Sequence, residues 1–247
     1  MKGNVENRKG KPKMEKIGRK AVVILCELVT VATCIWLLLH GILNNRLLLA
    51  VVTIPLILAP ALLERICKCK IWTPLYILCV LYAIGPMLGH TLNFYSLIPH
   101  WDKLLHITGG VVFAIVGFFL FQLMVGKDTK HVLAAGVFAL CFSMALSMLW
   151  EFYEFGSDTF LGTDTQADTV VTSITSHYFS DVMGEVGTIE PVESVAINGE
   201  AMDWGGYLDL GLHDTMMDML LETLGAVAVT VFYLLDKGKH PLIRFRE

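Results

Sequence analysis

The sequence predicts an all-α integral membrane protein, a bundle of six transmembrane helices with a long outward-facing loop between helices five and six. The chain has 247 residues, of which 55% are hydrophobic, and its mean hydropathy of +0.61 is too high for an ordinary soluble domain. Its apolar residues gather in six segments that approach about 20 residues, the length needed to cross about 30 Å of hydrocarbon. Basic residues concentrate in alternate connections between these segments, as they do in membrane proteins of defined topology.

The first span is predicted at residues 21–39, after a Lys- and Arg-rich tail at residues 1–20 that has no apolar periodicity. This apolar run lacks a small-residue cleavage site and is long for a signal-peptide core, which favours a retained helix. Prolines inside spans two and three predict kinks there. The other spans are predicted at residues 47–63, 71–88, 104–125, 132–150 and 216–235, with polar residues continuing span five to Asp158.

The distribution of basic residues predicts the orientation. All 19 Lys and Arg except Arg46 and Lys103 fall in the two tails, the second loop or the fourth loop. Six crossings place these segments on one side, which the positive-inside rule makes cytoplasmic. We therefore expect a multi-pass protein of the cytoplasmic (inner) membrane with both termini cytoplasmic. Its predicted parts are a basic tail at 1–20, helices one to five at 21–156, an acidic extracytoplasmic loop at 157–211, helix six at 212–236 and a basic tail at 237–247.

The predicted outer loop is long and acidic. Residues 157–213 contain many Asp and Glu but no Lys or Arg. A connection of this length is usually a functional lid or a flexible insertion. Its β-branched runs and the Asn198-Gly199 pair predict a small hairpin. None of the six Cys lies in this loop, so a disulfide framework is not expected.

Three polar sequence stretches lie at the predicted outer ends of spans four, five and six. They are WDKLLHITGG at 101–110, WEFYEFGSD at 150–158 and HDTMMDMLLETLG at 213–225. The i, i+3 and i+4 spacings place each polar set on one helix face. Ionisable groups in membrane spans usually face a protein interior or a cavity. The candidate site residues are Asp102, Lys103, His106, Glu151, Glu154, Asp214, Asp218 and Glu222, with Asp158 in the same polar layer.

So many acidic groups at one membrane level require a positive partner, because buried like charges repel and desolvation favours their neutral forms. The partner is a divalent metal, a shared proton, Lys103 or a cationic substrate. Carboxylates with one imidazole suit Mg²⁺, Mn²⁺ or Zn²⁺, but no complete motif such as HExxH is present. The alternative is a hydrogen-bonded seam with helix caps at Asp102 and Asp214. The predicted metal ligands are His106, Glu151, Glu154, Asp214 and Asp218.

These stretches, with GTDTQ at 162–166 and GLHDTMMDMLLETLGA at 211–226, resemble the uncharacterised YjdF-like family of bacterial inner-membrane proteins. They also look distantly like VanZ-like membrane proteins. The resemblance implies a bacterial cytoplasmic-membrane protein but no established activity, and residues 167–207 depart from the pattern as an insertion. The polar set that it supports is Asp102, His106, Glu151, Glu154, Asp214 and Asp218.

The sequence leaves three classes of function open. The first is an enzyme-like metal site that handles a lipid-linked or phosphate-bearing headgroup, with Lys103 stabilising an anionic group. The second is a cation- or proton-coupled transporter, although no inverted repeat relates the two halves. The third is a non-catalytic membrane module whose acidic loop binds an external partner. No fold signal supports nucleic-acid binding, no nucleophile is identifiable, and the metal, the substrate and the oligomeric state stay open.

Overall fold

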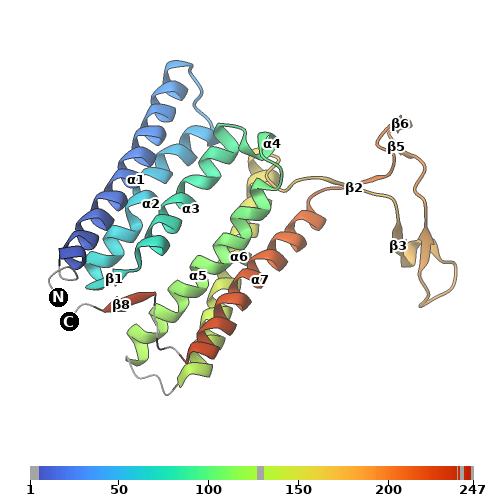
Figure 1. Ribbon diagram of the computed structural model, residues 1–247. Coiled ribbons are helices and arrows are strands. Elements are labelled where there is room, and N and C mark those ends of the chain that lie inside the picture. Colours follow the sequence, from blue (N-terminus) through green and yellow to red (C-terminus); the bar gives the residue numbers. More distant parts are fainter. Residues whose placement is uncertain (1–5, 127–130, 238, 240–241, 246–247) are drawn as a thin grey trace. The chain divides into compact units, whose positions relative to one another are not determined.

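The computed structural model describes residues 6–126, 131–237, 239 and 242–245. In these residues, six helices are long and apolar enough to cross a membrane (Figure 1), which confirms the predicted all-α membrane fold. The bounds of the six helices lie within a few residues of the predicted spans, except at the start of the first helix. They are α1 (Glu6–Leu39), α2 (Asn45–Ile66), α3 (Thr73–Thr91), α5 (Trp101–Val125), α6 (Val132–Leu161) and α7 (Leu212–Asp236).

Helix α1 differs from the prediction because it begins at Glu6 and includes most of the predicted basic tail. Hydrophobic periodicity detects only the apolar part of such a helix, whereas Lys, Arg and Glu have good helix propensity and extend it into the polar region. Arg19, within this segment, makes tertiary contacts, described below. Arg19 is therefore held by the fold, whereas the described residues 14–17 before it are exposed.

The chain forms two compact units, Met1–Ser147 with Leu221–Glu247, and Met148–Leu220. We call them unit one and unit two and describe each by itself. The hydrophobic core of unit one lies among α1, α2, α3 and α5, with a one-turn helix α4 (Phe94–Leu97) between α3 and α5. Its fully buried side chains include Leu37, Ile57, Val80, Met87 and Phe119.

Small residues bring the backbones of three helices of unit one into contact. A Cβ atom at Gly110 of α5 would overlap the carbonyl oxygen of Glu222 in α7, and one at Gly225 would overlap the carbonyl oxygen of Ile107. A Cβ at Gly117 would lie 2.8 Å from the Cα of Ala139 in α6. This is the close approach that small residues permit in membrane helices.

Both terminal segments meet at one end of unit one. Strand β1 (Cys69–Ile71) pairs in antiparallel orientation with β8 (Ile243–Phe245). Arg19 of α1 donates to Glu64 of α2 at 2.9 Å and also to the carbonyl of Ile71, while the Ile71 amide donates to Glu64 at 2.8 Å. An even number of membrane crossings requires the two terminal segments to lie on the same side, and their contact here agrees with that.

Unit two contains the ends of α6 and α7 and three two-stranded sheets of short strands (Figure 1). Strands β5 (Val195–Ile197) and β6 (Glu200–Met202) form a hairpin whose turn is Asn198-Gly199, both with positive φ (53° and 88°), as a type I′ turn requires. The predicted hairpin is thus confirmed. The strand pairs are β2 (Thr169–Val171) with β7 (Tyr207–Asp209), β3 (Ile174–Ser176) with β4 (Gly187–Ile189), and β5 (Val195–Ile197) with β6 (Glu200–Met202); a 3-10 turn, η2 (His177–Phe179), follows β3.

Candidate functional site

The first turns of α5 hold three of the predicted site residues in one group. The Asp102 carboxylate lies 3.2 Å from Lys103 Nζ through Oδ2 and 3.5 Å from His106 Nε2 through Oδ1. The contact between Asp102 and His106 follows directly from their i, i+4 spacing on the helix. The start of α5 is attached to α3, because the Trp101 indole N–H donates to the Gly85 carbonyl at 3.2 Å.

Glu222 of α7 faces the other nitrogen of the same imidazole. Its Oε2 lies 3.8 Å from His106 Nδ1, and both side chains are buried, with exposed fractions of 2% for Glu222 and 6% for His106. The backbone contacts at Gly110 and Gly225 explain this approach, because they hold α7 directly against α5. We call Lys103, Asp102, His106 and Glu222 the charged row.

One oxygen of the charged row is buried without compensation. Glu222 Oε1 is inaccessible to solvent and has no hydrogen-bond partner among the described residues. A buried carboxylate oxygen left unpaired costs on the order of several kcal/mol if the group is ionised. A positively charged ligand beside this oxygen would remove this cost.

Tyr82 is a neighbour of this region that the sequence did not single out. Its hydroxyl oxygen lies only 2.8 Å from where a Cβ of Gly109 would stand. Gly109 therefore leaves space for a phenol from α3 against α5, one turn beyond His106. A tyrosine inside an apolar span was the only sequence signal, and that signal is weak because such residues commonly serve in packing.

Four predicted site residues belong to unit two, and all are buried. The exposed fractions are 4% for Glu151 and Glu154, 8% for Asp214 and 1% for Asp218. The Trp150 indole N–H donates to Glu154 Oε1 at 2.9 Å, and the Ala167 amide donates to Asp214 Oδ2 at 2.8 Å. These acids are thus not directed into lipid or bulk water, as the predicted site requires.

Asp158 differs from the other acids, because its carboxylate holds the GTDTQ loop. It accepts hydrogen bonds from the Thr163 hydroxyl, from both the amide and the hydroxyl of Thr165 at 2.7 Å each, and from the Gln166 amide at 2.9 Å. The Gln166 side chain in turn donates to the Thr215 hydroxyl. Asp158 therefore organises the loop, and its place in the same polar layer as the candidate site stays a prediction.

Asp168 lies among other acids of the same loop. Loss of hydration, together with the charges of Asp164, Asp209 and Asp158, raises the pKa of its carboxyl above the ordinary value of 3.8. A raised pKa means that the folded loop favours the neutral carboxylic acid. The loop is therefore sensitive to acid in the sense that lower pH relieves repulsion within it.

Two acids of unit one lie beside His106. Asp102 and Glu222 flank its imidazole, and neither was in the predicted metal-ligand set. Asp102 and His106 each offer a ligand atom within 4.8 Å of one another, which is close enough to share a cation. Glu151, Glu154, Asp214 and Asp218 belong to unit two, so their membership of one ligand set with His106 stays a prediction.

The fold and the charged row define a multi-pass α-helical membrane protein with a buried His/carboxylate group. The chain belongs to the family described as "Predicted membrane protein (DUF2238)", whose model matches residues 22–238. This match agrees with the YjdF-like resemblance, whereas the distant VanZ-like resemblance stays a prediction. No curated protein and no solved structure matches the chain.

Proposed function

We propose that the protein binds a divalent cation between Asp102 and His106 and that this cation engages a phosphate-bearing headgroup of a lipid or lipid-linked molecule. One observation carries the proposal: a buried imidazole lies between two carboxylates, 3.5 Å from Asp102 and 3.8 Å from Glu222. Both separations exceed an ordinary hydrogen bond of about 2.7–3.2 Å. The imidazole is therefore close to both carboxylates.

The separation between Asp102 and His106 suits a shared cation. Two donor atoms bound to one Zn²⁺ at about 2.0–2.2 Å in tetrahedral geometry lie roughly 3.4 Å apart, and the observed separation of Oδ1 and Nε2 is 3.5 Å. Glu222 faces Nδ1 and favours a proton on that nitrogen, which leaves Nε2 able to bind the cation. Glu222 is thus a positioning residue for the imidazole.

Lys103 would supply the contact with an anionic headgroup. Its side chain is 29% exposed at the edge of the charged row, so it is accessible to a ligand while remaining beside Asp102. An ammonium group and a bound cation together form a suitable site for a phosphate. We include Glu151, Glu154, Asp214 and Asp218 in the proposal, as further cation ligands or acid/base groups, from their sequence positions.

Cation binding is tested on the purified full-length protein by metal analysis and by thermal unfolding after chelation and after addition of Mg²⁺, Mn²⁺ or Zn²⁺. At 100 times Kd, a cation stabilises the fold by about 2.7 kcal/mol, or about 5–11 °C in Tm for a chain of this size. His106→Asn is expected to lose this shift. His100→Asn is the matched control, since His100 is exposed and has φ 59°, a conformation that Asn tolerates.

Two results would overturn the proposal. One is purified protein without metal whose Tm is unchanged by chelation and by all three cations. The other is an equal Tm shift in His106→Asn, His100→Asn and the unaltered protein. A phosphate-bearing ligand is tested next, by comparing binding of phospholipid headgroups to the metal-loaded protein and to Lys103→Gln.

A second candidate function is cation-coupled transport, which the position of Glu222 favours. Glu222 lies two turns further along α7 than Asp214, roughly 12 Å at the helical rise, and its Oε1 has no hydrogen-bond partner among the described residues. Cation flux in proteoliposomes that Glu222→Gln abolishes would select transport. Metal-induced stabilisation without any flux would select the first function.

We also propose that both terminal segments are cytoplasmic and that the membrane is the bacterial cytoplasmic membrane. The pairing of β1 with β8 and the contact of Arg19 with Glu64 support a common side for the two segments. The concentration of Lys and Arg at this end supports the cytoplasmic side. In intact cells, we expect an added thiol reagent to label a Cys introduced at Met183, which is fully exposed, and not a Cys introduced at Met14.

A further inference from the structure

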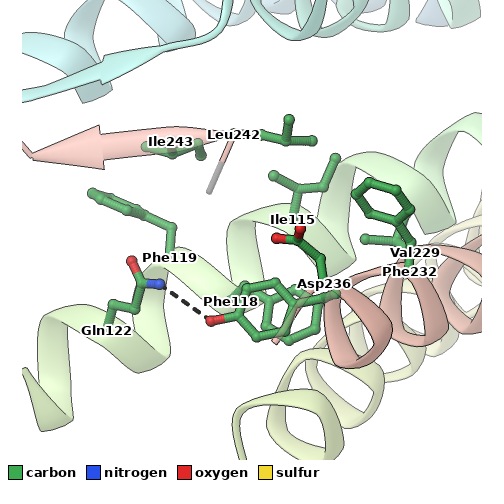
Figure 2. A pocket seen from close by; sticks show the side chains of 10 residues that line it. Ile115, Phe118, Phe119, Gln122, Val229, Phe232, Asp236, Leu242 and Ile243 are labelled. Atoms are coloured by element: carbon green, nitrogen blue, oxygen red, sulfur yellow. Dashed lines mark hydrogen bonds between the residues drawn. The ribbon is translucent and has the colours of Figure 1, made fainter. Parts of the chain in front are cut away.

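A hollow in unit one, well away from the charged row, has the composition of a ligand site (Figure 2). It lies between the later turns of α5 and α7 and the residues leading into β8, and it is open to the surface, with about 430 Å³ of non-atom space that includes open solvent. Gln122, which lines the hollow, lies 16 residues beyond His106 along α5, or about 24 Å along the helix axis. Its walls include Phe118, Phe119 and Phe232, and its polar members are Gln122, Tyr233 and Asp236.

The polar members are arranged around the hollow in a defined way. The Gln122 amide donates to the Tyr233 hydroxyl oxygen at 3.3 Å, and the Tyr233 ring stacks on Phe118 with centroids 3.8 Å apart. Among the described residues, the Tyr233 hydroxyl proton has no acceptor. A few oriented polar groups in a largely apolar hollow are typical of small-molecule sites. Tyr233 can therefore donate to a ligand.

The hollow lies at the level of the helix ends and is open toward lipid. Gln122 lies one turn before the end of α5 at Val125, and Asp236 is the last residue of α7. Helix ends of membrane spans lie near the headgroups. Phe232, one of the walls, is 61% exposed on a helix that is apolar enough to cross a membrane. A molecule of the bilayer can therefore reach the hollow from the side.

The charges at this end indicate which bilayer molecule fits. A single carboxylate, Asp236, lines the hollow (Figure 2), while the exposed Lys237 and Lys239 follow it in the chain. An acid beside bases complements a zwitterion that carries an ammonium and a phosphate. We propose that the hollow binds an amine-bearing glycerophospholipid. Its acyl chain lies against the phenyl rings, its ammonium at Asp236 and its phosphate at the lysines.

The test measures which phospholipids the purified full-length protein retains, by native mass spectrometry after equilibration with equal amounts of phosphatidylethanolamine and phosphatidylglycerol. Val229→Trp fills the hollow, because Val229 is one of its walls. Val231→Trp is the matched control, since Val231 lies two residues along the same helix and is 47% exposed. We expect retention to fall about tenfold in Val229→Trp only, and Asp236→Asn to lower the preference for phosphatidylethanolamine by about tenfold, the effect of losing one charged hydrogen bond.

Equal retention by the two tryptophan variants would overturn the proposal. Equal retention of the two lipids by the unaltered protein, with no change in Asp236→Asn, would also overturn it. If Val229→Trp does not elute as a folded species in size-exclusion chromatography, the headgroup preference of Asp236→Asn decides alone. None of these results depends on the cation proposed for the charged row.

Discussion

Gly110→Ala tests the contact that brings Glu222 to His106. The added Cβ would overlap the Glu222 carbonyl oxygen, and it would lie 2.8 Å from the carbonyl carbon of Glu222 and 3.0 Å from the Ala226 amide nitrogen. All three are backbone atoms of α7, so no side-chain rotation relieves the overlap. Overpacking of this kind costs about 1–3 kcal/mol, which corresponds to a fall in Tm of about 2–12 °C for a chain of this length.

The same change should weaken the cation site, because α7 must move away from α5 and carry Glu222 with it. Loss of a partner that orients a metal-binding imidazole typically lowers metal affinity about 10- to 100-fold. The assay is thermal unfolding of the purified protein, followed by Zn²⁺ titration. Gly18→Ala is the control, since a Cβ at Gly18 of α1 meets nothing within 4 Å, and Ala there favours the helix by up to about 1 kcal/mol. If Gly110→Ala matches this control in Tm and keeps its Zn²⁺ affinity, the packing of α7 against α5 is not as described.

Three further predictions concern other parts of the fold. Glu64→Gln removes the carboxylate of the ion pair with Arg19, in which the side chains of Arg19 and Glu64 are only 13% and 14% exposed. The free energy of unfolding should therefore fall by about 1.5–3 kcal/mol. Arg65→Met, at an exposed position, is the control and should leave Tm unchanged. Asp158→Asn weakens the hydrogen bonds that hold the GTDTQ loop, so proteolysis at this loop should accelerate at least about tenfold. If Asp158→Asn is cleaved no faster than the control Asp164→Asn, Asp158 does not hold the loop. Folding raises the pKa of Asp168, so the stability that its neutral form contributes is fully present below pH 3.8 and is lost as pH rises through the folded pKa. The resistance of the loop to protease should therefore decline over that pH range in the unaltered protein. In Asp168→Asn this resistance should depend less on pH.

Sequence spacing predicted one neighbour of His106 in the candidate site and did not predict the other. Asp102 and His106 are four residues apart on one helix, so their proximity was predictable. Glu222 is more than a hundred residues away, and the sequence gave no reason to expect it beside Nδ1 of His106. Its position depends on where α7 touches α5, which Gly110 and Gly225 determine through backbone contact.

Asp158, in contrast, makes contacts that are close in the sequence. Its position after two glutamates made it look like a member of the acidic layer, yet its carboxylate accepts the amides and hydroxyls of a loop a few residues further on. The Thr-rich GTDTQ segment could have indicated this, because Asp with nearby Ser or Thr often forms such local hydrogen bonds. These contacts of Asp158 are therefore local, and the sequence could have predicted them.

Hydropathy and charge were enough to place the six spans, because each span meets lipid and gains its main free energy from its own apolar residues. The Asn198-Gly199 hairpin was equally local, since its backbone angles are a property of two adjacent residues. Other features join segments far apart in the chain: the pairing of Ile71 with Ile243, the approach of Glu222 to His106, and the hollow between α5 and α7. Their geometry depends on how apolar surfaces fit together in three dimensions, and a one-dimensional pattern carries no information about that fit.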